Sequence, residues 1–303
     1  MSIIEKALER LEQSDIRTIS GNRGPVVAPS TFPREAASED LIGATWEAGE
    51  SLAPTAPAPL RTSQAVTLDL KALEKQGYLT PETMHLPRAD EYRRIKRPLL
   101  VNAFSDAAKK VKNANLVAVT SSVAGEGKSY TSLNLAMSIA AELDRTVLLV
   151  DTDVFKQSLT KTLKLSEHPG LTDFLRTEGA DLADYLLRTN VPNLAFIPAG
   201  RLDYQIAELW GSGKMQQFMD ELARRYPDRL VIFDTPPVLA HASTLVLTGM
   251  VGQVLMVVEA EKTDQHLVTE SLRVLGDNVR VGLILNKSNQ RESADYGYGY
   301  YSQ

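Results

Sequence analysis

One stretch, residues 117–129 with the sequence VAVTSSVAGEGKS, constrains the fold of this chain more than any other. An apolar run of strand type leads into a glycine turn, a lysine and a hydroxyl, and a helix-forming segment continues to about residue 142. Gly125 and Gly127 lack a Cβ, so the backbone there can curl and direct several N–H groups at an anion. The pattern predicts a buried strand, a phosphate-binding loop and a helix whose positive end points at the same anion.

The turn also carries the side chains that a bound nucleoside triphosphate needs. Lys128 is placed to reach its β and γ phosphates, and the hydroxyl of Ser129 is placed to bind Mg²⁺. The usual pattern begins with a glycine where this chain has Ser122, so a glycine-rich turn without a ligand is the alternative interpretation. We expect ATP to bind the loop and the first helical turn, which are Gly125, Glu126, Gly127, Lys128, Ser129 and Tyr130.

Two later apolar runs end in aspartates. Residues 146–150 precede Asp151 and Asp153, and a second run precedes Asp234. Because open α/β sheets bind ligands at the carboxyl ends of their strands, we expect these carboxylates near the phosphate loop. Other segments read as strands at 193–198, 254–259 and 279–286, and as helices at 171–176, 214–226 and 265–275. This alternation predicts an α/β fold of the P-loop NTPase type, with a mostly parallel sheet and helices on both faces.

Composition excludes several classes of function. A net charge of −5 gives no support for nucleic-acid binding, and the absence of cysteine excludes disulfides and thiolate metal sites. The four histidines lack metal-ligand spacing. We expect no signal peptide. The longest stretch without acidic or basic side chains, 235–258, contains Pro236, Pro237 and Gly249, which favours a helix, a turn and a buried strand over a membrane span.

The chain before the phosphate loop reads as two parts. Ser2 and Glu5 form a capping box, and an apolar face follows, which predicts a short amphipathic helix that lies against its own domain or against a partner. Nine of the 15 prolines precede residue 99, many of them in an Ala- and Pro-rich segment typical of a disordered linker. The predicted parts are the helix (1–13), the linker (14–66), an ATP-binding domain (67–290) and a tyrosine-rich tail (291–303).

Charged residues recur at steps of three ahead of Pro98. Glu91, Arg94 and Arg97 fall on one side of a helix that Pro98 would disturb or end. A solvated basic helix face and a contact surface for a neighbouring subunit both fit this pattern.

The chain ends in a run of tyrosines and glycines, YGYGYY, before its last two residues. Glycine removes both side chain and stiffness, so this tail does not suit a core helix or a stable strand. It is flexible enough to bring a hydroxyl into an active site, whereas the alternative is low-complexity sequence without chemistry. An ATP-binding core favours the first interpretation. The candidate phosphoacceptors are Tyr296, Tyr298, Tyr300 and Tyr301.

In combination, these motifs resemble the bacterial tyrosine kinases of capsular and exopolysaccharide synthesis, over residues 90–303. The segment SSVAGEGKS, ending at Ser129, is similar to their first phosphate-binding motif. LLVDTD, ending at Asp153, and VIFDTPP, around Asp234, resemble their second and third motifs. The charged steps before Pro98 resemble the family's subunit-contact pattern, and the tyrosine cluster resembles its autophosphorylation tail. Residues 1–13 and 91–100 are most similar to the branch of exosortase-linked (PEP-CTERM) exopolysaccharide systems.

The resemblance implies an ATP- and Mg²⁺-dependent protein-tyrosine autokinase that regulates exopolysaccharide or capsule chain synthesis and export. Transfer of the γ-phosphoryl group to a neighbour's tail in a ring-like homo-oligomer is implied, with Asp153 orienting or deprotonating the hydroxyl. Asn286 would read the adenine edge, unless it is a turn asparagine. The implied catalytic residues are Lys128, Asp151, Asp153 and Asp234, and the implied metal ligands are Ser129, Asp151 and Asp234.

The resemblance also implies a partner and a location. A separate inner-membrane polysaccharide chain-length protein, or co-polymerase, would activate the kinase and hold this cytoplasmic chain at the inner face of the membrane. One departure from the family is Phe155, which stands where an arginine is usual, and the adjacent Lys156 is a candidate substitute.

Two other functions remain open. A partitioning ATPase of the MinD/ParA kind would share the sheet, but its signature lysine corresponds to Val123 here and it lacks the tyrosine tail. A nucleotide-binding scaffold without turnover would fit the altered second motif. Formation of phosphotyrosine from labelled ATP separates all three.

Overall fold

The computed structural model describes residues 63–105, 111–225, 228–276 and 279–288. Residue contacts divide the chain into two units, 1–56 and 57–303, and all described residues belong to the second. The predicted N-terminal helix, most of the predicted linker and the tyrosine tail lie outside the described residues.

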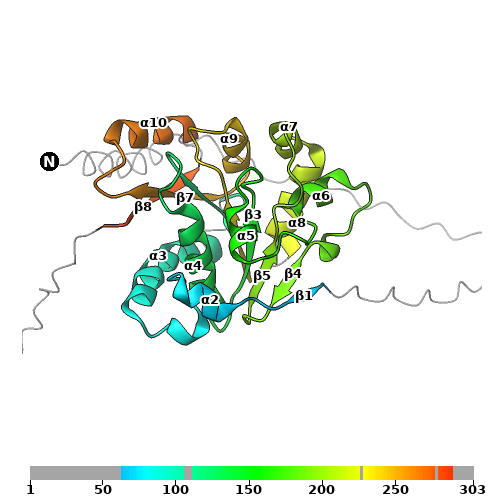
Figure 1. The fold of residues 1–303 in the computed structure, drawn as a ribbon. Coiled ribbons are helices and arrows are strands. Elements are labelled where there is room, and N and C mark those ends of the chain that lie inside the picture. Colours follow the sequence, from blue (N-terminus) through cyan, green and yellow to red (C-terminus); the bar gives the residue numbers. More distant parts are fainter. Residues whose placement is uncertain (1–62, 106–110, 226–227, 277–278, 289–303) are drawn as a thin grey trace, which may run out of the picture. The chain divides into compact units, whose positions relative to one another are not determined.

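An eight-stranded sheet forms the centre of the described region (Figure 1), in the order β1-β4-β5-β3-β6-β2-β7-β8. Its strands are β1 (Ala65–Val66), β2 (Leu116–Ser121), β3 (Thr146–Asp151), β4 (Leu187–Thr189), β5 (Leu194–Ile197), β6 (Arg229–Asp234), β7 (Gln253–Glu259) and β8 (Arg280–Asn286). Neighbouring strands are parallel except for β4 and β5. The predicted mostly parallel α/β fold is therefore confirmed. β1 lies inside the segment predicted as linker and pairs with β4.

Helices cover both faces of this sheet. They are α2 (Leu70–Lys75), α3 (Pro87–Phe104), α4 (Lys128–Ala140), α5 (Ser158–Thr162), α6 (Leu171–Arg176), α7 (Ile206–Trp210), α8 (Gly213–Arg225), α9 (Ala242–Thr248) and α10 (Gln265–Leu275), with short 3₁₀ turns at Pro81–Thr83 and Leu182–Asp184. In β2, Val117 and Val119 point into a core shared with α3 and α4, whereas Leu116 and Ala118 point into a second core with α6 to α9. This alternation is the period of two that a strand covered on both faces requires.

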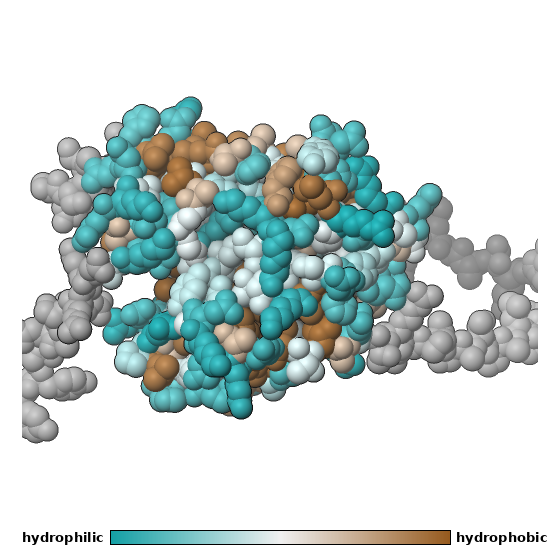
Figure 2. All heavy atoms as spheres, in the orientation of Figure 1, coloured by the Kyte–Doolittle hydropathy of each residue, from teal (hydrophilic) through white to brown (hydrophobic). Residues whose placement is uncertain are grey.

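The surface agrees with this layered arrangement. Figure 2 shows a mostly hydrophilic face, with hydrophobic side chains gathered near α10 and near α7. The stretch 235–258 folds as α9, a turn and β7, as predicted. Among the described residues, no helix combines the length and the apolar content needed to span a bilayer.

Pro98 was predicted to disturb or to end the charged helix, and the prediction that it ends the helix is wrong. Helix α3 continues through Pro98 to Phe104. A proline inside a helix removes one hydrogen bond. Here the turn beyond it is held by tertiary contacts: Leu99 is buried in the core, and Gln253 donates from Nε2 to the Leu99 carbonyl oxygen (3.2 Å).

Candidate functional site

The glycine turn lies between β2 and α4, as predicted. Gly125 and Gly127 have φ values of +95° and +97°, which lie in the left-handed region that side chains disfavour. A Cβ added at Gly127 would lie 2.1 Å from Nδ2 of Asn286, so a larger residue there would displace the Asn286 amide from the loop. The conformation of this turn therefore depends on both glycines.

The aspartates that follow the apolar runs come together beside this turn. Asp151 and Asp234 occupy paired positions at the carboxyl ends of β3 and β6, and both are fully buried. Asp153 is also buried, and its Oδ2 lies 3.0 Å from Nζ of Lys128 in a buried ion pair. The structure thus brings together the four residues that the sequence analysis named as catalytic candidates.

Lys128 is held in its charged form by this arrangement. Burial by itself lowers the pKa of the ammonium group, but the neighbouring carboxylates of Asp234 and Asp153 outweigh burial and raise that pKa above its ordinary value. The lysine therefore remains a cation that can exchange a carboxylate partner for a phosphate.

Both side-chain oxygens of Asp151 are engaged within the protein. Oδ2 accepts hydrogen bonds from the backbone N (2.9 Å) and the hydroxyl (2.8 Å) of Thr160, and Oδ1 accepts from the backbone N of Asp153 (3.1 Å). Burial, with a smaller contribution from the charge of Asp234, raises the pKa of Asp151 to about 7. These contacts favour an indirect role near a metal, through water, over direct coordination.

Asp234, in contrast, has one uncommitted oxygen. Its Oδ1 accepts from the hydroxyl of Ser132 (3.0 Å), and Ser129 also interacts with this carboxylate. Oδ2 is buried and has no hydrogen-bond partner, and the same is true of the hydroxyl of Ser122. Burial raises the pKa of Asp234, although Lys128 opposes the shift. A buried carboxylate oxygen without a partner is costly unless a ligand satisfies it.

These residues fit a nucleotide-bound Mg²⁺ ion. Within the described residues, no group of three or more His, Cys, Asp or Glu side chains could hold a metal. Mg²⁺ in nucleotide sites takes few protein ligands and completes its shell with water and phosphate oxygens. The orphaned Oδ2 of Asp234 beside the hydroxyl of Ser129 suits that mode of binding.

Glu126 and Asn286 hold the glycine turn in place through hydrogen bonds. The buried Glu126 carboxylate accepts from the backbone N of Val123 (2.8 Å) and of Glu259 (3.3 Å), and Asn286 donates from Nδ2 to the Glu126 carbonyl (2.7 Å). Lys287 donates to the Gly125 carbonyl (2.8 Å). Contact of Asn286 with adenine stays a prediction, since the one side-chain hydrogen bond of Asn286 described here is to the loop.

Other predicted residues lie away from the carboxylates or outside the described chain. The hydroxyl of Tyr130 donates to the carbonyl of Gly77 (2.7 Å), next to α2. Glu91, Arg94 and Arg97 are all exposed on α3, which agrees with the predicted one-sided row. The four tail tyrosines lie outside the described residues.

Sequence reasoning missed two contributors to this site. Thr160 lies in α5 and Ser132 lies in α4, and neither belongs to a motif. Only the rule that strand ends converge with the following loops could have pointed to the regions that contain them.

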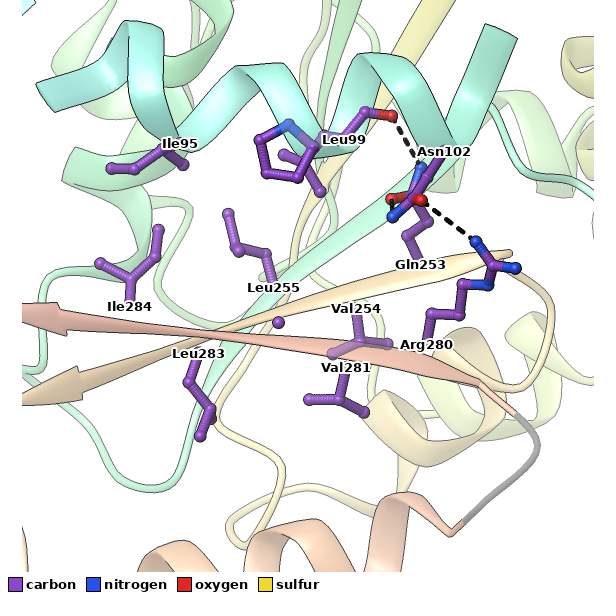
Figure 3. Close-up of a pocket in the computed structure, with 12 residues that line it drawn as sticks. Ile95, Leu99, Asn102, Gln253, Val254, Leu255, Arg280, Val281, Leu283 and Ile284 are labelled. Carbon is purple, nitrogen blue, oxygen red and sulfur yellow. Dashed lines mark hydrogen bonds between the residues drawn. The ribbon is translucent and has the colours of Figure 1, made fainter. Parts of the chain in front are cut away.

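A cavity of about 210 Å³ lies elsewhere, between α3 and strands β7 and β8 (Figure 3). Ile95 and Leu99 face Leu255 and Ile284 at one end, and Asn102, Gln253 and Arg280 form a hydrogen-bonded chain at the other. None of the four catalytic candidates lines this cavity. We place the functional site at the glycine turn, because the buried charges and the orphaned carboxylate oxygen are there.

Known proteins resemble this chain over the same region. The sequence model of the AAA_31 family, described as an AAA domain, matches residues 114–276, which is more than half of the chain. The tyrosine-protein kinase ptk of Acinetobacter johnsonii is 34% identical over 184 residues, covering 60% of this chain and 24% of that protein. The tyrosine-protein kinase CpsD of Streptococcus agalactiae serotype III is 30% identical over 190 residues, covering 61% of this chain and 79% of that protein. The chain spans between 24% and 32% of the length of its first three curated relatives.

Solved structures of kinase domains are also similar to this chain. The kinase domain of VpsO has a TM-score of 0.56 at 27% identity, and the match covers 69% of this chain and all of that domain. The kinase domain of the Escherichia coli tyrosine kinase ETK has a TM-score of 0.61 at 25% identity, with 79% of this chain and 95% of that domain covered.

Proposed function

Because the chain belongs to the AAA domain family and to the bacterial tyrosine kinases, we propose that it is an ATP-dependent protein-tyrosine autokinase. Its substrates are the hydroxyls of its own tail tyrosines, Tyr296, Tyr298, Tyr300 and Tyr301. The observation that carries this proposal is the buried ion pair of Lys128 and Asp153, set beside Asp151 and Asp234 at the end of a glycine turn.

Phosphoryl transfer needs positioning and charge neutralisation more than covalent chemistry. Lys128 and the N–H groups of the turn, from Gly125 to Ser129, hold the phosphates. Bound Mg²⁺, held by Ser129 and Asp234 and through water by Asp151, would neutralise charge on the β and γ phosphate oxygens.

Asp153 is the group that orients or deprotonates the incoming hydroxyl. A tyrosine hydroxyl has a pKa near ~10, so a carboxylate beside it assists at neutral pH. In the structure Oδ2 of Asp153 is occupied by Nζ of Lys128 at 3.0 Å. When phosphates attract Lys128, that oxygen becomes free to accept the proton, which couples the base to the arrival of nucleotide.

Our proposal for the wider setting rests on the sequence resemblance described above. The kinase regulates exopolysaccharide or capsule chain synthesis and export, in an exosortase-linked system. It assembles as a ring-like homo-oligomer through the exposed row Glu91, Arg94 and Arg97 on α3, and phosphorylates in trans. A separate inner-membrane co-polymerase activates it and holds it, as a cytoplasmic chain, at the inner face of the membrane.

The catalytic proposal is tested with purified chain, Mg²⁺ and labelled ATP. We expect phosphotyrosine in wild type, mapped by mass spectrometry to residues 296–301. Lys128→Met should remove it, whereas Lys71→Met, which changes an exposed lysine on α2, should leave it intact. Label that persists in Lys128→Met, or that maps outside the tail, contradicts the proposal. ATP hydrolysis without phosphotyrosine would match the ATPase switch instead.

Oligomer control is tested separately by size exclusion. Each phosphotyrosine adds roughly −1.5 to −2 charge, which repels tails docked near acidic sites. We expect ATP to dissociate the wild-type oligomer but not a variant with all four tail tyrosines changed to phenylalanine. Identical profiles for both chains, with and without ATP, would rule out this cycle.

A further inference from the structure

An aromatic pair connects the two loops that leave the aspartate-bearing strands. Phe155 lies two positions after Asp153 in the loop that follows β3, and His241 lies in the loop between β6 and α9. Their rings stack with centroids 5.0 Å apart and planes inclined by 16°. Because β3 and β6 are neighbours in the sheet, with Asp151 paired to Asp234, the pair lies at the edge where the carboxylates gather.

Phe155 is exposed but anchored. Its side chain is 38% exposed, whereas Asp153 is 1% exposed. The residues that follow Phe155 are tied to Asp153: the backbone N of Lys156 donates to its Oδ1 (3.1 Å) and the backbone N of Gln157 to its carbonyl (2.6 Å). Gln157 also donates from Nε2 to the carbonyl of Gly200 (2.9 Å). A single exposed apolar side chain is ordinary, but the backbone just after Phe155 is hydrogen-bonded to the buried Asp153 and its ring is stacked on His241.

We propose that Phe155 and His241 form an aromatic platform that positions the ring of the incoming tyrosine, so that its hydroxyl reaches Asp153. This inference rests on the proposed kinase function and names two substrate-positioning residues for it. Aromatic rings associate in offset-stacked or edge-to-face arrangements at centroid distances of about 4.5–7 Å. Phe155 is partly exposed despite its stacking on His241, so part of its ring surface is available for such a contact.

The chemistry of the acceptor fits this surface. A tyrosine is a flat apolar ring with one polar end, so its recognition needs an apolar face next to a hydrogen-bond acceptor. The site supplies carboxylates for the hydroxyl, and this pair supplies a ring surface. An arginine, which the family resemblance leads one to expect at position 155, would place a positive charge there instead.

The test measures peptide binding to the full chain. The probe is a fluorescein-labelled peptide with the sequence of residues 292–303, titrated in the presence of Mg²⁺ and a non-hydrolysable ATP analogue and followed by anisotropy. We expect Phe155→Ala to weaken binding about two- to twelvefold and Phe155→Trp to preserve it. His241→Ala should weaken binding less. Leu143→Ala, which changes a 95% exposed side chain just before the start of β3, is the control and should have no effect.

A second peptide, with its four tyrosines replaced by leucine, separates ring recognition from a structural effect. We expect it to bind weakly and equally to wild type and to Phe155→Ala. Nucleotide affinity, measured alone, should match wild type in every variant. The platform is overturned if Phe155→Ala binds the tyrosine peptide like wild type, if the loss is equal for the leucine peptide, if nucleotide affinity falls in parallel, or if wild type binds neither peptide.

Steady-state kinetics of phosphoryl transfer to the tyrosine peptide separate failure of the aromatic platform from failure of the kinase function. If Phe155 positions the acceptor, Phe155→Ala raises KM for the peptide and leaves kcat close to wild type. Wild type that binds the peptide but transfers no phosphate refutes the kinase function and leaves the platform standing. Transfer with an unchanged KM in Phe155→Ala refutes the platform and leaves the kinase function standing.

Discussion

The substitution Asp151→Asn should stabilise the nucleotide-free chain, although it removes a residue of the proposed site. Asp151 is fully buried, faces Asp234 across paired positions, and has its pKa raised to about 7 by burial and by that neighbour. Asparagine carries no charge and keeps an oxygen that can accept from Thr160, but its amide nitrogen cannot accept from the backbone N of Asp153, and that loss costs about 1 kcal/mol. The wild-type chain therefore pays a desolvation and repulsion cost that the variant avoids.

The sign and the size of the stability change follow from the coupling between proton binding and folding. A raised carboxyl pKa gives stability that is complete below the unfolded value of 3.8 and is lost as the pH rises through about 7. At 1.36 kcal/mol per pH unit, the rise of this pKa to about 7 lowers the free energy of unfolding by at most about 4 kcal/mol at pH 8 and by less than half as much at pH 5. Relaxation around the site and the lost hydrogen bond from the backbone N of Asp153 both reduce these limits, so we expect Asp151→Asn to gain about 1–3 kcal/mol at pH 8 and less at pH 5.

Urea unfolding in EDTA without nucleotide, followed by circular dichroism at pH 5 and pH 8, measures this difference. Asp144→Asn changes an exposed aspartate just before β3 and is the matched control, with an expected effect within about 0.5 kcal/mol at both pH values. If Asp151→Asn is no more stable than wild type at pH 8, or gains equally at both pH values, the carboxylate is not strained by its surroundings and the reasoning fails.

Three further outcomes are expected. Asn286→Ala removes the hydrogen bond that holds the Glu126 carbonyl and should weaken ATP binding about two- to twelvefold in a fluorescent-nucleotide titration; unchanged affinity would show that the loop holds its shape alone. Gly200→Ala combines a φ of +83° with a side-chain atom 2.4 Å from the new Cβ, so its loss of stability in urea should exceed that of Gly179→Ala, which has φ +67° and open space; equal losses would contradict this. Asp234→Asn should abolish the extra rise in Tm that Mg²⁺ gives beyond ATP alone, and a retained rise would exclude Asp234 as a ligand.

The long strands β2, β3, β6 and β7 could be predicted because their apolar runs are continuous, and β3 and β6 end in an aspartate that marks the strand end. The helices 171–176 and 265–275 also match their predicted bounds. β1 and β4 were not predicted, because strands of two and three residues are too short to show a hydrophobic periodicity. The course of α3 beyond Pro98 depends on burial of Leu99, which local propensity does not reveal.

The candidate site, like the fold, was only partly predictable from the sequence. Lys128 and the aspartates could be placed from motif and strand-end rules, because parallel strands bring their carboxyl ends to one edge. The direction in which each side chain points could not be predicted from these rules. That Asp151 is turned toward Thr160, or that Asn286 holds the loop, depends on which partners the rest of the fold brings near.

The ion pair of Lys128 and Asp153 can couple nucleotide binding to the availability of the proposed base. Removing one partner from a buried pair leaves an uncompensated charge, at a cost of roughly 3–5 kcal/mol. We therefore expect Lys128 to leave Asp153 only when phosphate oxygens replace the carboxylate at its Nζ. The proposed base is covered while nucleotide is absent and uncovered by the same event that brings the phosphoryl donor. A tyrosine that arrives first meets a carboxylate already bound to lysine, so productive transfer requires nucleotide to bind before the acceptor.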